Sequence, residues 1–259
     1  MTRRKSARAF RGVYLAILMA FMYLPILMMV ALSFNDSVSR ANWGGFTLDW
    51  YKKLLDDPAV IESVKVTFSV AVLASLISAV IGTAAAIGIH SMKKGWSMAM
   101  VNLSYLPMTT PDIVTGVSLM LMFVFAKIPL GYCTMLMSHI AFCIPYVLFS
   151  VQPRLRMMNP NMYEAALDLG CKPWQAILKV IVPEVEQGIA AGTLLAFTMS
   201  IDDFVISYFT SNTAQNLSML VYSAARRGIE PTMYALSTLM FLTVLVLLLV
   251  VNRKAHLID

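Results

Sequence analysis

Two adjacent aspartates, Asp202 and Asp203, interrupt the apolar stretch GIAAGTLLAFTMSIDDFVISYFT at residues 188–210. A third aspartate, Asp112, lies in the apolar context TTPDIVTG. Ionised carboxylates are costly inside a membrane, where they usually mark a substrate or ion pathway. Spaced carboxylates suit a small, multiply charged cation, such as a chain of protonated amines separated by methylenes. We therefore predict that these three aspartates line one pathway.

Other side chains near the carboxylates could complete such a pathway. Ser200 and Asp203 share one helical face, whereas Asp202 points about 100° away at about 3.6 residues per turn. Tyr208 and Trp50 offer aromatic faces for cation–π contacts of roughly 0.5–2 kcal/mol. Both aspartates reach the pathway only if this segment is bent or lies at the pathway mouth, so the sequence leaves open which one does. Alternatively, the two aspartates cap the end of a span and are exposed to water on the outer side of the membrane.

The composition is that of a membrane protein. The chain has 259 residues, 59% hydrophobic and 13% charged, with a mean hydropathy of +0.72, whereas a soluble domain carries roughly 25% charged residues. The apolar runs that reach the length of about 20 residues needed to span a bilayer are 12–34, 64–90, 97–125, 130–151, 183–209 and 233–251. We expect an all-α polytopic protein with six transmembrane helices, the third kinked or broken near Pro107 and Pro111.

The distribution of lysine and arginine predicts the orientation. If the N-terminus is inside, most of these residues fall in cytoplasmic segments, as the positive-inside rule requires. We expect both termini in the cytoplasm, a basic arm at 1–11 near membrane lipid, and a transmembrane domain at 12–259 with its core at about 62–252. The apolar run after Arg3-Arg4 is too long for a cleaved signal, so we expect an uncleaved first span. The net charge of +6 lies in short loops, which argues against nucleic-acid binding.

Signals of enzyme chemistry are weak. The three cysteines form no C-x-x-C pair and the three histidines form no H-E-x-x-H motif, so we expect neither a disulfide framework nor a metal site. No G-x-S-x-G motif and no Walker loop is present. His139 is the one candidate for chemistry within the membrane, and a lone histidine there is more often a packed or hydrogen-bonded residue. We predict no catalytic residue and no cofactor bound by this chain.

Two predicted outer segments are longer than simple turns. The loop at 35–61 contains DWYKKLL, which predicts a short amphipathic helix at the membrane surface. It is either an interfacial anchor or a contact for a component arriving from outside, with Trp50 as the first candidate. The stretch before the sixth run, SNTAQNLSMLVYSAARRGIEP, predicts another short amphipathic helix that ends at Arg226 and Arg227.

The inner loop at 152–183 has its own folding signals. A short helix is expected after Asn159, followed by a left-handed turn at Gly170 and a second helix that opens at Pro173. Pro183 is expected to open the fifth span. A folded insert of this length is not needed to reverse the chain direction, which favours a docking site for another protein.

This inner loop resembles the EAA loop of ATP-binding-cassette (ABC) importer permeases, whose pattern is E-A-A, three residues, G, nine residues, I-x-L-P. The matching residues are Glu164, Ala165, Ala166, Gly170 and Pro183. Valine replaces the isoleucine and the leucine of the pattern, which is a conservative departure. The resemblance implies a cytoplasmic coupling helix between the fourth and fifth spans that docks on a separate ATPase, with Glu164 and the Gly170 turn as its key positions.

The resemblance extends along the chain through NWGGFTLDWYKKLL, MTTPDIVTGVSL, SHIAFCIPYV, YEAALDLG and FTMSIDDFVIS. Together these stretches resemble the spermidine/putrescine permeases of the PotC type, in the MetI-like family of binding-protein-dependent transporters. The resemblance implies a multi-pass subunit of a polyamine importer in the bacterial inner membrane. It implies as partners a PotB-type permease, a PotA-type ATPase dimer that uses ATP and Mg, and an extracytoplasmic PotD-type binding protein.

The residues leave other functions open. A permease of the same family could carry another solute, although the carboxylates within the membrane favour a cation. A cation channel or a secondary transporter would need no ATPase, so the EAA-type loop would have no role in it.

Overall fold

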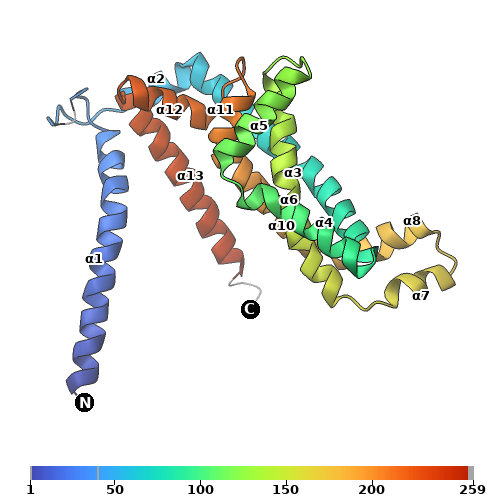
Figure 1. Ribbon diagram of the computed structural model, residues 1–259. Helices are drawn as coiled ribbons and strands as arrows, with labels where there is room; N and C mark the ends of the chain where they lie inside the picture. The colour runs from blue at the N-terminus through green and yellow to red at the C-terminus, as the bar shows by residue number, and fades with distance from the viewer. Residues whose placement is uncertain (1, 40, 256–259) are drawn as a thin grey trace. The chain divides into compact units, whose positions relative to one another are not determined.

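The computed structural model describes the backbone of residues 2–39 and 41–255, and side chains at 12–39, 41–243 and 245. Within these residues the fold is helical, apart from one isolated bridge between Asn35 and Phe46. The prediction of an all-α chain is therefore confirmed for the described part. The chain divides into two compact units, Met1–Ile61 with Val221–Asp259 and Glu62–Leu220 (Figure 1).

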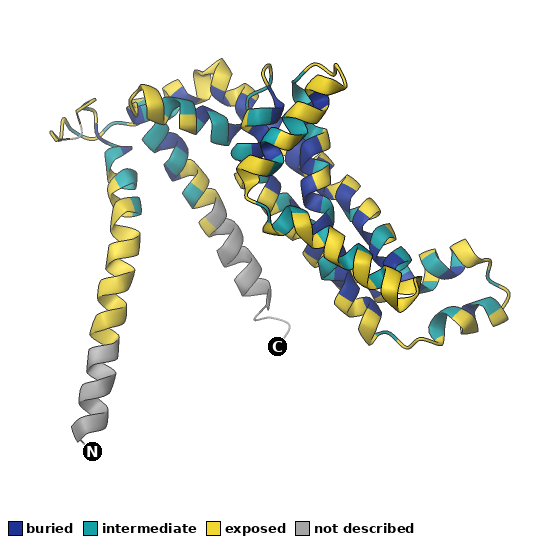
Figure 2. Cartoon of the chain, in the orientation of Figure 1, coloured by how far each residue is buried: buried dark blue, intermediate teal, exposed yellow. Residues whose placement is uncertain are grey.

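The first unit contains α1 (Thr2–Leu32), α2 (Asp49–Asp56), α13 (Pro231–Ala255) and the end of α12 (Leu217–Arg227). Helix α13 packs against both α1 and α2. Helices α2 and α12 confirm the two short helices predicted in the outer segments. No residue in the apolar part of α1, Gly12–Leu32, is buried (Figure 2). The side chains of this segment can therefore face lipid or another subunit. The side chains of the predicted basic arm, 1–11, lie outside the described residues.

The second unit is built around α6 (Tyr132–Met157). Its other elements are α3 (Pro58–Ser91) from Glu62 onward, α4 (Lys94–Thr109), α5 (Asp112–Phe125), α7 (Met162–Asp168), α8 (Pro173–Ala176), the π-helical turn η1 (Ile177–Ile181), α9 (Val182–Glu184), α10 (Glu186–Asp202), α11 (Val205–Thr210) and the start of α12. Helices α4, α5, α10 and α11 all contact α6. Helix α3 begins at Pro58, within the predicted outer loop, because proline is well suited to the first turn of a helix.

The number of spans is partly visible in the helices. Among the described residues, three helices are each long and apolar enough to cross a membrane. The number of spans rises to as many as five if each of two bent helix pairs is counted as one span. In one pair, α4 and α5 meet at 103°, which confirms the predicted break in the third span. The break lies at Thr110 and Pro111, whereas Pro107 is accommodated inside α4. The sixth predicted span, 233–251, lies within α13, and the side chains at its end are outside the described residues.

The fifth span does not open at Pro183, contrary to the prediction. The turn η1 and α9 carry the helix past Pro183, and a 73° bend separates this segment from α10, which begins at Glu186. Proline has no amide hydrogen to donate to the preceding turn. That turn is widened, with the Val182 amide donating to the Ile177 carbonyl five residues earlier, and it accommodates the proline without ending the helix.

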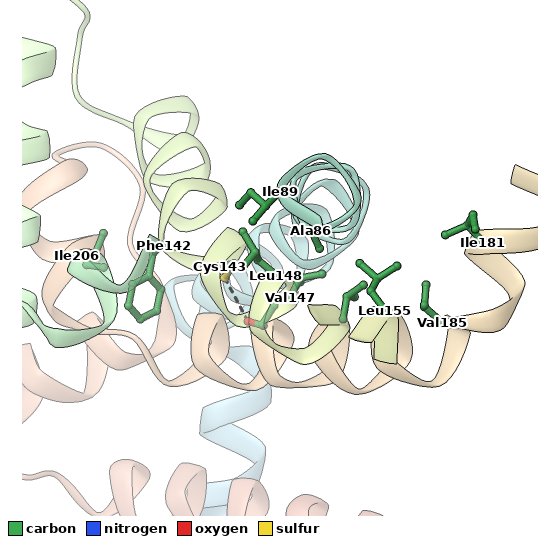
Figure 3. Close-up of a cluster of buried hydrophobic side chains, with 12 residues drawn as sticks. Ala86, Ile89, Phe142, Cys143, Val147, Leu148, Leu155, Ile181, Val185 and Ile206 are labelled. Carbon is green, nitrogen blue, oxygen red and sulfur yellow. Dashed lines mark hydrogen bonds between the residues drawn. The ribbon is translucent and has the colours of Figure 1, made fainter. Parts of the chain in front are cut away.

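Helix α6 is approached closely by both α10 and α3. A Cβ atom at Gly188 of α10 would lie 2.9 Å from the carbonyl oxygen of Ser150, so only glycine fits there without a shift. The hydroxyl of Ser78 in α3 donates to the carbonyl of Ile140 at 3.0 Å. Small residues and interhelical hydrogen bonds of this kind hold membrane helices together. The apolar core of the unit gathers around the same contacts (Figure 3), where the Cys143 thiol donates to a carbonyl of α10.

Candidate functional site

A buried polar cluster lies where α6, α10 and α11 meet. His139 of α6 is 1% exposed; its Nδ1 is 2.7 Å from the Ser200 hydroxyl and its Nε2 is 2.8 Å from the Ser207 hydroxyl. Asp203 lies between α10 and α11, and its side chain is 7% exposed. Its Oδ2 is 3.4 Å from Nε2 of His139. Its carboxylate also accepts the amide hydrogens of Ile206 and Ser207. Asp203 therefore caps α11 and links it to α6.

Asn216 closes the cluster from the segment before α12. Its Nδ2 donates to the Ser207 hydroxyl at 2.8 Å and to the main-chain carbonyl of Asp203 at 2.9 Å. Its Oδ1 accepts the amide hydrogen of Met219 at 2.9 Å. Asn216 is only 2% exposed, so these bonds are made in the interior of the unit. The cluster thus links α6, α10, α11 and the segment before α12 around the break in the fifth span.

The structure separates the two adjacent aspartates. The side chain of Asp203 is turned into the protein, whereas Asp202, the last residue of α10, is exposed. Asp112, the first residue of α5, is exposed as well. Helix α5 packs on α11, and a Cβ at Gly116 would lie 3.2 Å from the ring of Phe209. Asp112 and Asp202 are therefore exposed carboxylates on two helices next to α11. Helix α5 packs on α11, and α10 precedes α11 in the chain.

The two predicted aromatic contacts lie in different units. Tyr208 of α11 is 46% exposed, and its ring centroid is 5.5 Å from that of Phe209. Trp50 of α2 is half-buried, its indole N–H donates to the Asn35 carbonyl at 2.8 Å, and Nζ of Lys53 lies 4.5 Å from the ring centroid. Trp50 therefore holds the outer loop together, and one face of its ring already carries an ammonium group. A contact of Trp50 with substrate stays a prediction.

The inner loop folds as a helix, a glycine turn and a second helix. At the end of α7 the Gly170 amide donates to Leu167 at 2.9 Å and the Cys171 amide to Ala166 at 3.1 Å, the paired bonds of a Schellman motif. The φ angle of Gly170 is +87°, a conformation that glycine adopts without steric cost. The left-handed turn predicted at Gly170 is therefore confirmed.

The helix in this loop starts later than expected. Helix α7 begins at Met162, because the Asn159 side chain accepts the amide of Asn161 and so stabilises a turn ahead of the helix. Of the residues that match the EAA pattern, Glu164, Ala165, Gly170 and Pro183 are exposed and Ala166 is buried. Leu169 is 87% exposed and Trp174 is 59% exposed. Both apolar side chains lie close in the chain to the ordered turn at Gly170.

Sequence reasoning missed the partners of His139. Ser200, Asp203 and Ser207 recur at helical spacing, which was a signal for one polar face. Nothing local connects that face to His139, which is 61 residues away from Ser200 in the chain. Within the described residues, no group of three or more histidine, cysteine, aspartate or glutamate side chains is arranged to hold a metal ion.

Long apolar helices and two bent helix pairs in the described residues define the class of the chain as a helical membrane protein. Residues 78–259 match the family described as "Binding-protein-dependent transport system inner membrane component". The chain belongs to this family, and it is a multi-pass protein of the inner membrane.

Curated relatives match over most of the chain. It is 32% identical to the spermidine/putrescine transport system permease protein PotC of Escherichia coli (strain K12) over 243 residues, covering 93% of this chain and 92% of the relative. It is 36% identical to the putrescine transport system permease protein PotI of the same strain over 241 residues, covering 88% and 84%. The PotC protein of Haemophilus influenzae is 32% identical over 248 residues, covering 94% and 96%.

Solved structures share the fold. A chain of a bacterial ABC transporter involved in import of the acidic polysaccharide alginate superposes with a TM-score of 0.71 at 17% identity, covering 99% of this chain and 97% of that chain. The bacterial alginate ABC transporter in complex with an alginate pentasaccharide-bound periplasmic protein gives a TM-score of 0.70 at 16% identity, covering 98% and 96%. At this level of identity the likeness concerns the fold.

Proposed function

We propose that this chain is a permease subunit of an ATP-driven importer that passes a polyamine, spermidine or putrescine, to the cytoplasm. The observation that carries the proposal is the pair of exposed carboxylates, Asp112 and Asp202, in the second unit. A carboxylate facing hydrocarbon is costly, so both need a water-filled pathway or a polar surface of another subunit. The transport functions named for PotC and PotI, which resemble this chain, supply the substrate class.

The pathway would be formed together with a second permease of the PotB type. Asp112 and Asp202 would hold the ammonium groups in succession, and the exposed face of Tyr208 would contact the passing cation. Binding at each site is expected to be weak, because a tight site would trap the substrate. A PotD-type binding protein would deliver the substrate from outside, in keeping with a family that depends on such proteins.

The proposed topology has six spans with both termini in the cytoplasm, α13 being the sixth. The positive-inside distribution supports it, and so do the helices and bent pairs that provide up to five spans in the described residues. We retain the transmembrane domain at 12–259, its core at about 62–252 and the inner loop at 152–183 as parts of this proposal.

The inner loop would couple the permease to a PotA-type ATPase dimer. The exposed Glu164 and the hydrogen-bonded turn at Gly170 suit a short docking element. Movement of this element would be transmitted through η1 and α9 to α10. ATP and Mg would be used by the partner ATPase, so this chain would bind no cofactor and make or break no covalent bond.

Uptake in proteoliposomes tests the proposal. The chain would be reconstituted with its candidate partner permease, ATPase and binding protein, and ATP-dependent uptake of labelled spermidine and putrescine measured. Wild type should transport at least one of them, Glu164→Ala should lose ATPase coupling, and Asp56→Asn, an exposed change on α2, should behave as wild type. ATPase association without polyamine uptake would leave a same-family permease for another solute. Failure of the ATPase to associate would favour a channel or a secondary transporter.

A further inference from the structure

The buried cluster around His139 has no part in the pathway just described. Two of its members, Ser200 and Asp203, lie on either side of the pathway residue Asp202 in the chain. We propose that His139 and Asp203 are positioning residues. They hold the break between α10 and α11 in one geometry and so orient Asp202 and Tyr208 at the pathway, without touching the substrate themselves. This inference rests on the proposed function for the meaning of the pathway, but not for the geometry of the break.

The hydrogen bonds determine which atoms of the cluster donate. The single hydroxyl hydrogen of Ser207 goes to Oδ2 of Asp203, at 2.9 Å. The Ser207 oxygen can then only accept from its two other partners, Nδ2 of Asn216 and Nε2 of His139, each at 2.8 Å. Nε2 therefore carries a hydrogen, and in the neutral ring Nδ1 is the acceptor for the Ser200 hydroxyl, 2.7 Å away. One neutral tautomer of His139 satisfies every member of the cluster.

Asp203 replaces backbone bonds that the break removes. The first amides of any helix lack partners in the preceding turn, and the Asp203 carboxylate accepts those of Ile206 at 3.2 Å and Ser207 at 2.9 Å. Broken backbone at membrane depth is tolerated only where such groups are satisfied within the protein or beside water. With the Ser207 hydroxyl and His139 beside it as well, both carboxylate oxygens are engaged inside the protein and are not presented to a passing cation.

The direction of Asp202 depends on this arrangement. Asp202 ends α10 and Asp203 starts the break, so the backbone between them is held in place through the contacts of Asp203 and Ser200. Removing the His139 ring leaves the buried hydroxyl of Ser200 without its partner, and the cluster must rearrange or admit water. The break then loses its fixed direction, and the exposed carboxylate one residue away moves with it.

Thiol labelling at position 202 of the reconstituted complex is the test. The native thiols are first removed by Cys133→Ser, Cys143→Ala and Cys171→Ser, and assembly of this background into the complex is confirmed. A charged methanethiosulfonate reagent is then used to measure the labelling rate of Asp202→Cys per folded molecule. His139→Ala should change that rate by about fivefold or more, and His139→Gln, which can still donate to Ser207, should largely restore it. His90→Ala, an exposed histidine change at the end of α3, is the matched control.

The outcomes separate positioning from a purely structural or a direct role. If His139→Ala lowers only the yield of folded protein and leaves the labelling rate unchanged, the proposal is wrong. If Asp203→Asn raises the KM for spermidine but leaves the labelling rate at 202 unchanged, Asp203 touches the substrate and the proposal is wrong as well. Should His139→Ala not fold, Asp203→Asn carries the same measurement, because it should also change the labelling rate at position 202. Labelling requires no polyamine, so a failed substrate assignment leaves this test intact.

Discussion

Gly192 and Val147 bring α10 and α6 into backbone contact: a Cβ atom at Gly192 would lie 2.8 Å from the Cα of Val147. This approach sets which face of α10 is buried against α6 and therefore which side chains of α10 remain exposed. Ser200 is on the buried face, and Asp202 is not. The helix contact and the candidate pathway are thus parts of one arrangement.

Enlarging Gly192 should destabilise the unit. Gly192→Ala forces the two helices apart or strains them, and overpacking of this kind costs about 1–3 kcal/mol. We expect a lower unfolding temperature in detergent and less protein in the membrane. Gly88→Ala in α3 is the control, because a Cβ there meets nothing within 4 Å; that change should be neutral or stabilising by up to about 1 kcal/mol. Equal stability of both variants would show that α6 and α10 do not pack as described.

The turn in the inner loop should depend on glycine. Gly170→Ala places a Cβ in a backbone conformation with φ +87°, at a cost of roughly 1–2 kcal/mol. Hydrogen exchange at the Gly170 and Cys171 amides should accelerate, and association with the ATPase should weaken. Gly95→Ala, where φ is not positive and the space is open, should change neither measurement. Normal protection of both amides in the Gly170 variant would contradict the Schellman geometry.

Neutralising Asp112 should weaken polyamine transport selectively. Asp112→Asn removes one of the exposed charges on the proposed pathway, and loss of about 1.4 kcal/mol of attraction corresponds to roughly tenfold in affinity. We expect a higher KM in the liposome assay, with a larger effect on spermidine than on the less charged putrescine. Asp112→Glu keeps the charge and should retain most of the transport. An unchanged KM for Asp112→Asn would place this carboxylate at a subunit surface instead.

The outer loop should loosen when Asn35 is truncated. Asn35 is 2% exposed; its Nδ2 donates to the Asn42 carbonyl at 2.9 Å and its Oδ1 accepts the Gly44 amide at 2.8 Å. Asn35→Ala leaves buried groups unpaired, which costs about 1–3 kcal/mol. Limited proteolysis between residues 36 and 48 should become faster. Asn42→Ala retains the main-chain carbonyl and is the matched control, so similar proteolysis of both variants would argue against this role.

The features that were predictable from sequence have local causes. Apolar runs indicated the membrane helices, the Thr110–Pro111 step broke the third span as expected, and Gly170 ended its helix. Each depends on side chains within a few residues of one another. The start of the fifth span was wrongly predicted at Pro183, because the wide turn η1, a non-standard helix geometry, accommodates the proline within a helical segment and α10 begins only at Glu186.

The sequence by itself determined that two carboxylates occur side by side in an apolar segment and point in different directions. Only the tertiary structure decided that Asp203 faces His139 and that Asp202 stays exposed. Helical geometry gives the angle between neighbouring side chains but not their absolute direction. That direction depends on which face of α10 meets α6, a choice made by contacts between residues such as Gly192 and Val147 that are far apart in the chain.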